Sequence, residues 1–243
     1  MRAVILAGGK GTRLRPYTTV LPKPLVPIGE RPILELIIHQ LGRAGFEQVD
    51  FLVGHLGELI RAYLVESGAV PAGMKMRFIF EEEPLGTAGA LHQIEPPDQS
   101  FLVMNGDILT TLDYADFMRH HHEQGGALTI ATFKKDVELA LGVLKGPAGE
   151  PLAVTDYVEK PTLHYDVSMG IYAYSPTALQ HVPEGHFDFP DLVLKLIAAG
   201  ERVVRYPFDG EWFDIGTPAE HERADQAFNS DSARFNSQLA TSV

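Results

Sequence analysis

The sequence contains no cysteine, a single tryptophan and no apolar run of membrane-spanning length. Without cysteine the chain can form no disulfide, use no thiolate nucleophile and build no cysteine-ligated metal centre. Its apolar segments fall well short of the roughly 18 residues that a membrane span needs. The apolar start of the chain is also too short for a signal peptide and passes directly into a glycine-rich loop. These absences predict a cytoplasmic protein without a membrane partner.

Basic residues are also scarce. The chain has 20 Lys and Arg against 32 Asp and Glu, which gives a formal net charge of −12. A surface this acidic repels a nucleic-acid backbone over long range, so we expect no nucleic-acid partner. A few local cations could still bind a small anion inside a cleft.

In its first half the chain alternates short, β-branched apolar runs with helical patterns. We expect buried strands at Arg2–Ala7, Gln48–Val53, Met76–Glu81 and Phe101–Met104. Helical spacing is found at Pro32–Ala44, Leu56–Glu66, Gly86–Ile94 and Asp113–Gln124. This alternation predicts an α/β fold with a doubly wound, mostly parallel, Rossmann-like sheet.

In the second half the pattern changes to strands separated by turns. We expect strands at Leu128–Lys134, Gly142–Lys145, Ala153–Glu159, Val167–Tyr174 and Arg202–Phe208, and a helix at Pro190–Ala199. No linker or repeat divides the chain. We therefore predict one domain, residues 1–228, with extra β insertions in its second half. Residues 229–243 are polar and are expected to form a flexible tail.

The strongest local feature is the segment LAGGKGTRL, residues 6–14, directly after the first expected strand. Three glycines in four positions let backbone N–H groups approach an anion closely. The carboxyl end of a strand in an α/β sheet is also where ligands bind. The segment does not fit the phosphate-binding Walker loop, and Leu14 excludes a dinucleotide fingerprint. A tight turn with two solvated cations is the alternative.

Six collinear motifs identify the family. GGKGTRL, PKPLVPIG, EEEPLGTAGAL, NGDIL, VEKP and WFDIGTP, taken in this order, resemble the sugar-1-phosphate nucleotidyltransferases from about residue 1 to 228. The motifs are most similar to those of mannose-1-phosphate and heptose-1-phosphate guanylyltransferases. The resemblance implies the reaction of an NTP with a sugar 1-phosphate to give an NDP-sugar and pyrophosphate, usually with Mg²⁺.

The resemblance also implies a nucleotide site, in which Arg13 grips the phosphates that leave. Glu81 could accept hydrogen bonds from guanine, and the PLGTAGA loop resembles guanylyl-transferring members, so GTP is the expected nucleotide. Transfer from dTTP or UTP is the alternative, since three adjacent acids can also form a solvated loop. The nucleotide-binding residues implied are Leu6, Ala7, Gly8, Gly9, Gly11, Thr12, Arg13, Glu81, Gly86 and Thr87.

Catalysis and metal binding are assigned in the same way. The resemblance implies that Arg13, Lys23 and Asp107 are catalytic and that Asp107 and Asp214 together hold Mg²⁺, a cation that prefers oxygen ligands. Each aspartate follows an apolar run, where a turn or helix cap is the alternative. A regulatory homologue that binds nucleotide sugars without turnover is the alternative from another class.

For the sugar phosphate, the resemblance implies that Glu159 binds the sugar hydroxyls and Lys160 pairs with the phosphate. Met169 would leave less polar contact near the sugar. The sugar-phosphate residues implied are Asn105, Gly142, Glu159, Lys160 and Gly170.

Two further motifs predict local structure. Thr217, Pro218 and Glu220 fit a helix-capping box. The run His120–His122 predicts a solvated helix face, because consecutive helical residues point about 100° apart and cannot converge on one metal ion. The chain is too short for the C-terminal appendages of some relatives, so a minimal enzyme is expected, either a monomer or a small homo-oligomer.

Overall fold

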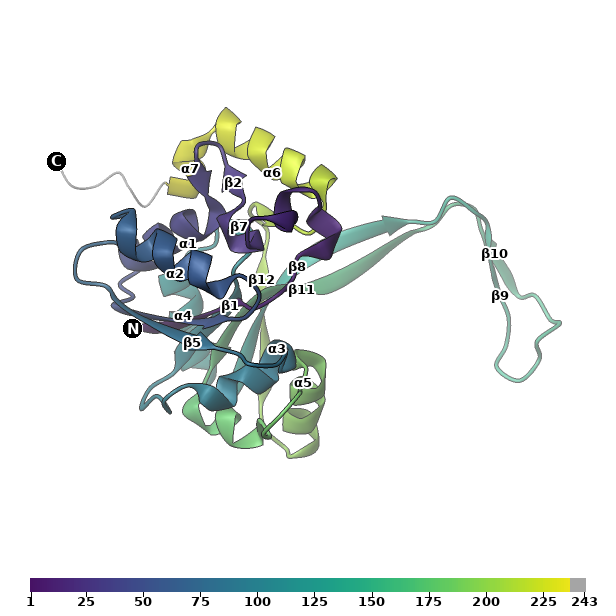
Figure 1. The fold of residues 1–243 in the computed structure, drawn as a ribbon. Coiled ribbons are helices and arrows are strands. Elements are labelled where there is room, and N and C mark those ends of the chain that lie inside the picture. The colour runs from purple at the N-terminus through teal and green to yellow at the C-terminus, as the bar shows by residue number, and fades with distance from the viewer. Residues whose placement is uncertain (237–243) are drawn as a thin grey trace.

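The computed structural model describes residues 1–236 and shows a seven-stranded sheet flanked by helices (Figure 1). The strand order is β12-β8-β11-β6-β1-β4-β5. β11 runs antiparallel to both of its neighbours, and the other six strands run parallel to one another. The strands are β1 (Arg2–Ala7), β4 (Gln48–Val53), β5 (Lys75–Phe80), β6 (Phe101–Asn105), β8 (Leu128–Glu138), β11 (Thr162–Tyr174) and β12 (Val203–Phe208).

Helices cover both faces of the sheet, as the doubly wound prediction requires. Along β1, Ala3 and Ile5 belong to one core cluster and Val4 to the other, because successive side chains in a strand point to opposite faces. The first cluster includes α1 (Ile33–Arg43), α2 (Gly57–Glu66), α4 (Tyr114–Gln124) and α6 (Pro218–Ser230); the second includes α3 (Gly86–Gly89) and α5 (Phe189–Ala198). No helix in the described part of the chain is both long and apolar enough to cross a bilayer.

The edge strand β5 differs from the prediction. It alternates exposed and half-buried residues and is not buried on both faces. Its only neighbour in the sheet is β4, because β5 is an edge strand. The prediction that this strand is buried on both faces was therefore wrong.

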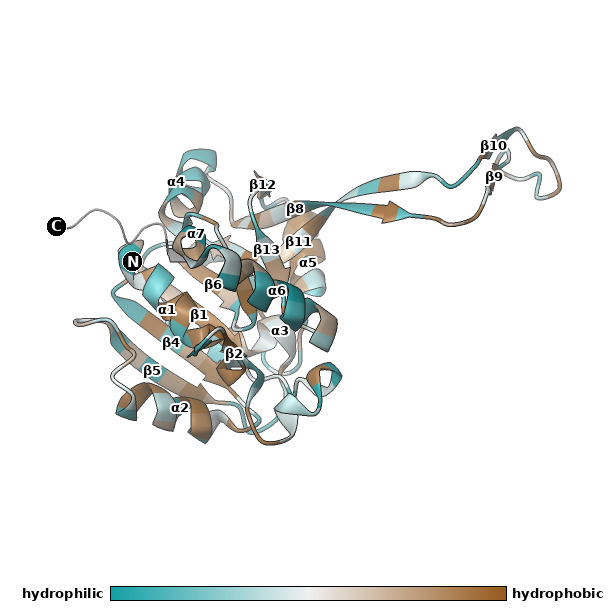
Figure 2. Cartoon of the chain, turned by 90° about the horizontal axis from the view of Figure 1, so that it is seen from above, coloured by the Kyte–Doolittle hydropathy of each residue, from teal (hydrophilic) through white to brown (hydrophobic). Residues whose placement is uncertain are grey.

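β8 and β11 both extend beyond their expected limits into a long two-stranded arm. They pair without a break from Thr132 and Ser168 out to Glu138 and Thr162, and β9 (Val143–Lys145) and β10 (Asp156–Val158) continue the hairpin. In both Figure 1 and Figure 2 the hairpin projects away from the rest of the molecule. We call residues 134–166 the arm; none of them belongs to either core cluster.

Helical structure continues beyond residue 228, where we expected the flexible tail to begin. α6 continues to Ser230, and α7 (Ser232–Asn236) follows it. Phe235 is only 3% exposed and packs its ring 5.8 Å from that of Phe228. Through Phe235, α7 is therefore packed on the core. The rest of the expected tail, 237–243, lies outside the described residues.

Candidate active site

A pocket of about 310 Å³ opens at the carboxyl ends of β1 and β6. Ligands bind at this edge of a parallel sheet because the loops between strands and helices converge there. The pocket lining combines the ends of these strands with the loops that carry the sequence motifs. Its lining residues are Leu6, Ala7, Gly8, Gly9, Lys23, Pro24, Glu81, Pro84, Gly86, Thr87, Asn105, Gly106 and Asp107.

Most of the predicted nucleotide residues thus lie in one pocket. Pro24, Pro84 and Gly106 were not predicted, although each lies inside a motif that was. Gly11, Thr12 and Arg13 lie outside the lining.

The glycine-rich loop needs glycine for two separate reasons. A Cβ on Gly8 would lie 2.7 Å from Oε1 of Glu81, so a larger residue would collide with that carboxylate. Gly11 has a φ of +59°, which residues with a Cβ rarely adopt, and its carbonyl accepts a 2.7 Å hydrogen bond from the Thr18 hydroxyl. Gly8 therefore lets the loop approach the Glu81 carboxylate closely, and Gly11 lets the loop turn so that its carbonyl binds the Thr18 hydroxyl.

Lys23 forms an ion pair with Asp107 across the pocket. Lys23 begins a short 3₁₀ turn after Pro22, and Asp107 lies in the turn between β6 and β7 (Ile108–Thr110). Lys23 Nζ donates to Oδ2, whereas Oδ1 of Asp107 is buried without a hydrogen-bond partner in the described structure. A buried carboxylate oxygen without a partner is costly unless a ligand satisfies it.

Asp214 lies next to this ion pair. β13 (Trp212–Asp214) pairs antiparallel with β7, which sets Asp214 opposite Ile108, and Ile215 N donates to the Asp107 carbonyl at 3.1 Å. Burial, and then the neighbouring Asp107 carboxylate, raise the pKa of Asp214, and Lys23 offsets part of this effect. The fold therefore brings together two aspartates that are far apart in the sequence.

The donor set fits Mg²⁺. Oδ1 of Asp107 has no hydrogen-bond partner, and the carboxylate of Asp214 is close enough for the charge of Asp107 to raise its pKa. No cluster of three or more His, Asp or Glu side chains suited to a metal ion occurs within residues 1–236. Mg²⁺ does not need one, because it commonly binds one or two carboxylates and completes its octahedron with water and substrate phosphates.

Glu81 lines the pocket from the end of β5. Burial raises the pKa of Glu81, and its Oε2 accepts a hydrogen bond from Leu85 N at 3.2 Å. The adjacent Glu82 and Glu83 are exposed. Of the three consecutive acids, only Glu81 therefore faces the pocket.

Thr87 also lines the pocket, but its hydroxyl already forms hydrogen bonds within the protein. Its Oγ1 donates to Asp188 at 3.2 Å and accepts from Phe189 N at 2.8 Å. Thr87 thus attaches the pocket loop to the start of α5.

Arg13 is exposed and lies near Asp214. Its Nη2 is 3.4 Å from the position that a Cβ on Gly216 would occupy, and its charge slightly lowers the pKa of Asp214. The segment that carries Gly216 is held by the predicted capping box, since Thr217 Oγ1 accepts from Glu220 N at 3.3 Å. Arg13 thus lies near Asp214 but outside the pocket lining.

Two of the five predicted sugar-phosphate residues are close to the pocket. Gly170 has a φ of +75°, and a Cβ there would lie 2.6 Å from Nδ2 of Asn105. Met169 is fully buried in the core, and its carbonyl accepts from Trp212 Nε1 at 3.0 Å. The Met169 side chain therefore cannot reduce the polarity around a sugar, contrary to our expectation.

The other three lie on the arm and do not line the pocket. Gly142 packs against the Tyr157 ring, whose hydroxyl donates to Glu159 at 2.8 Å. Glu159 and Lys160 are exposed, and Lys160 adopts a φ of +46°. Within one chain, this structure does not bring these residues to the nucleotide pocket.

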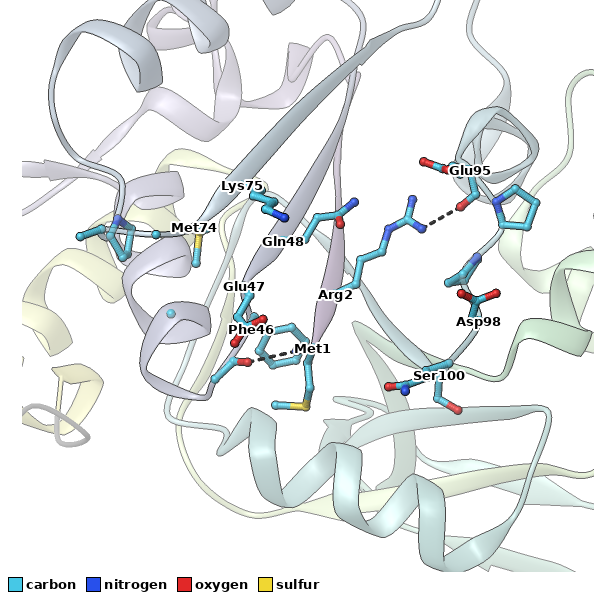
Figure 3. A pocket seen from close by; sticks show the side chains of 18 residues that line it. Met1, Arg2, Phe46, Glu47, Gln48, Met74, Lys75, Glu95, Asp98 and Ser100 are labelled. Carbon is cyan, nitrogen blue, oxygen red and sulfur yellow. Dashed lines mark hydrogen bonds between the residues drawn. The ribbon is translucent and has the colours of Figure 1, made fainter.

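A larger hollow of about 780 Å³ lies at the other end of the sheet, where the parallel strands begin (Figure 3). It is lined by the starts of strands, including Arg2, Lys75 and Ser100. Arg2 pairs with the buried Asp50 and donates to the Glu95 carbonyl at 2.7 Å, which braces the N-terminus. None of the predicted site residues lines this hollow, so it is not the candidate site.

Comparison with known proteins shows the family of the chain. The model of the family described as Nucleotidyl transferase matches residues 2–230. The chain is 32% identical to a UTP–glucose-1-phosphate uridylyltransferase of Synechocystis, over 92% of this chain and 62% of that protein. It is 30% identical to a mannose-1-phosphate guanyltransferase of Debaryomyces hansenii, over 90% of this chain and 62% of that protein.

Among solved structures, HddC from Yersinia pseudotuberculosis matches with a TM-score of 0.72 and 28% identity, over 93% of this chain and 99% of that one. The same protein has also been solved in complex with GMP-PN. The chain described here therefore belongs to the nucleotidyl transferase family. It spans about 62% of the length of the curated relatives named above.

Proposed function

We propose that this protein transfers a nucleoside monophosphate from an NTP, with GTP favoured, to a sugar 1-phosphate. The products are an NDP-sugar and pyrophosphate. The observation that carries the proposal is the pocket itself, where a glycine-rich loop faces Lys23, Asp107 and the half-buried Glu81, with the carboxylate of Asp214 beside that of Asp107. The substrates have matching chemistry: phosphates for the loop and the lysine, and a base for Glu81.

The reaction needs no general base, because the attacking oxygen of a sugar phosphate is already an anion at neutral pH. That oxygen forms a bond to the α-phosphorus, and the bond from the α-phosphorus to the bridging oxygen of the β-phosphate breaks, releasing pyrophosphate. The task of the protein is to hold two polyanions together and to stabilise the charge that moves between them.

Each site residue has a place in that task. Glycine-loop backbone N–H groups approach the nucleotide phosphates, and Lys23 offsets their charge near the reacting centre. Arg13, which lies near Asp214, would contact the phosphates that leave. Asp107 and Asp214 would hold Mg²⁺, which when bound supplies positive charge to the phosphate oxygens.

Glu81 is the basis of the preference for GTP. A carboxylate can accept from both the N1–H and the exocyclic amine of guanine, and neither uracil nor thymine offers that pair. Its half-buried position makes an unmatched base costly, because the carboxylate would keep only its hydrogen bond from Leu85 N. Transfer from UTP is the second candidate, supported by the uridylyltransferase relative at 32% identity; dTTP is a further alternative.

The test is a substrate matrix of GTP, UTP, dTTP, CTP and ATP against mannose, glucose and heptose 1-phosphates, with release of pyrophosphate as the readout. We expect kcat/KM for GTP to exceed that for UTP and dTTP by tenfold or more, which is about 1.4 kcal/mol. Glu81→Gln should reduce this ratio, whereas Glu83→Gln, an exposed neighbour, should not.

A tenfold preference for UTP or dTTP would contradict the guanine assignment and leave nucleotidyl transfer in place. Nucleotide binding without pyrophosphate release from any combination would instead favour the regulatory homologue.

A further inference from the structure

The arm leaves the molecule beside the pocket and runs away from it. At its root, Gly170 of β11 packs against the pocket residue Asn105. From Ser168 to Thr162 the strand takes six residue steps outward, roughly 20 Å at the rise of a β-strand. Each step is paired with β8, so the arm is a continuous ladder that cannot fold back without losing backbone hydrogen bonds.

Lys160 lies just beyond Thr162, where the pairing of β11 with β8 ends, and its backbone conformation is unusual. It is exposed, forms no ion pair with any described residue, and adopts a φ of +46° next to Pro161. The Pro161 carbonyl accepts a 3.0 Å hydrogen bond from Leu139 N, which holds the bend in place. Non-glycine residues held in the left-handed region are found preferentially at functional sites.

The pocket, for its part, is short of positive charge. Lys23 is the only cation among its lining residues, and Asp107 already pairs with it. Two polyanionic substrates brought together there would need a further cation.

The surface of the arm is unusually apolar. Half of the exposed large hydrophobic side chains in residues 1–236, nine of eighteen, lie between residues 137 and 165. Leu152 is 96% exposed, Leu141 77% and Leu144 61%. Exposed apolar surface concentrated on one projecting element is typical of a protein contact.

We propose that the arm of one molecule docks on a second copy of this chain and places Lys160, with Glu159, at the partner's sugar-phosphate site. This proposal rests on the proposed function. A second copy is the occupant because the lining of its pocket holds a single cation, Lys23, which is already paired with Asp107, and because the continuous ladder carries the arm away from its own pocket. Reciprocal exchange of an identical element is a common route to a dimer.

Complementation between two defective copies tests the shared site. Lys160→Ala and Asp107→Asn chains carrying different tags are co-expressed, and the doubly tagged species is purified. We expect each variant alone to lose at least tenfold in kcat/KM for the sugar phosphate. The mixed species should recover about half of the wild-type activity, because one of its two sites combines an intact pocket with an intact arm. A mixed species no more active than its parents would overturn the proposal.

Cross-linking tests the contact without relying on catalysis. Because the chain has no cysteine, a bis-maleimide can join only cysteines that are introduced. Lys160→Cys in one tagged copy should link to Val20→Cys in another, since Val20 is 69% exposed on the loop between Arg13 and Lys23. Val65→Cys, 55% exposed on α2, is the matched control and should not link.

The outcomes of the two experiments separate the hypotheses. A cross-linked dimer from a chain inactive with every substrate would refute the proposed function and support arm exchange. An intramolecular link in the Lys160→Cys/Val20→Cys double variant, with a monomeric mass, would show that the arm serves its own pocket and would overturn the exchange.

Discussion

At the scale of single residues, the site depends on an aspartate with only one of its two carboxylate oxygens hydrogen-bonded. Asp107 gives one oxygen to Lys23 and holds the other buried without a partner. Stability alone would favour satisfying both oxygens. In the proposed function, this unpaired oxygen would bind the Mg²⁺ that accompanies the substrates.

We therefore expect Asp107→Asn to lower turnover with Mg²⁺ by a hundredfold or more, a loss of about 2.7 kcal/mol in transition-state stabilisation. The substitution keeps the shape of the side chain but removes the charge that the cation and Lys23 both use. Steady-state rates over a range of Mg²⁺ concentrations measure the effect. Asp98→Asn, on an exposed residue at the opposite edge of the sheet, is the control. A near-normal rate would remove Asp107 from the mechanism.

His121 shows how burial changes a residue that the sequence treats as surface. Only 1% exposed, it contacts Thr129 Oγ1 through Nδ1 at 2.7 Å and Ser175 Oγ through Nε2 at 3.1 Å, so the expected solvated helix face is wrong for this histidine. Ser175 donates its own proton to the Gly126 carbonyl, so Nε2 donates and Nδ1 accepts. The neutral ring is satisfied, and burial, with His122 and His120, lowers the pKa of His121 to about 4.

The fold should consequently lose stability in acid. The unfolded chain binds a proton near pH 6.5 and the folded chain only near pH 4, so the contribution of His121 is complete above pH 6.5 and is lost as the pH falls towards 4. Between pH 7.5 and 5 we expect a loss of roughly 2 kcal/mol in the free energy of unfolding, measured with urea. His121→Asn should lose less over this range, and His186→Asn, at an exposed histidine remote in sequence from His121, as much as wild type. Equal losses in all three proteins would contradict this account.

At the scale of elements, the C-terminal helix α7 is short but structurally important. Phe235 packs against Phe228 and Phe213, and the Gln40 side chain donates to the Phe235 carbonyl at 2.9 Å. The helix thus joins α1 to α6. A polar-looking segment becomes part of the core through a single aromatic side chain.

We expect Phe235→Ala to lower the free energy of unfolding by about 3 kcal/mol, since it leaves a cavity among three elements. Urea denaturation at neutral pH measures it. Leu194→Ala, 65% exposed on α5, should change it by less than about 0.5 kcal/mol. A similar small effect at Phe235 would mean that α7 is not docked.

At the scale of the whole molecule, the sheet and its helices carry the stability while the arm lies outside the core. Neither core cluster includes any residue of the arm. Replacing the tip loop, residues 146–155, by Asn-Gly would close the hairpin between Lys145 and Asp156 with a favoured two-residue turn. We expect the free energy of unfolding to stay within about 1 kcal/mol of wild type, measured by urea denaturation. A larger loss would show that the tip stabilises the folded molecule.

The sequence by itself determined the alternation of strands and helices, because hydrophobic periodicity is a local property. β1 and β4 begin and end where their apolar runs do, and the capping box at Thr217 was visible in three residues. The motifs that line the pocket could also be predicted, since the carboxyl ends of parallel strands share one edge of the sheet.

Tertiary structure alone decided what lies beside what. The exposure of β5 follows from its place at the sheet edge, and the burial of His121 and Phe235 follows from elements distant in the sequence. The ion pair of Lys23 with Asp107 joins residues 84 positions apart. The direction of the arm depends on the pairing of β8 with β11, which local hydrophobicity does not encode because its side chains are exposed on a two-stranded ladder.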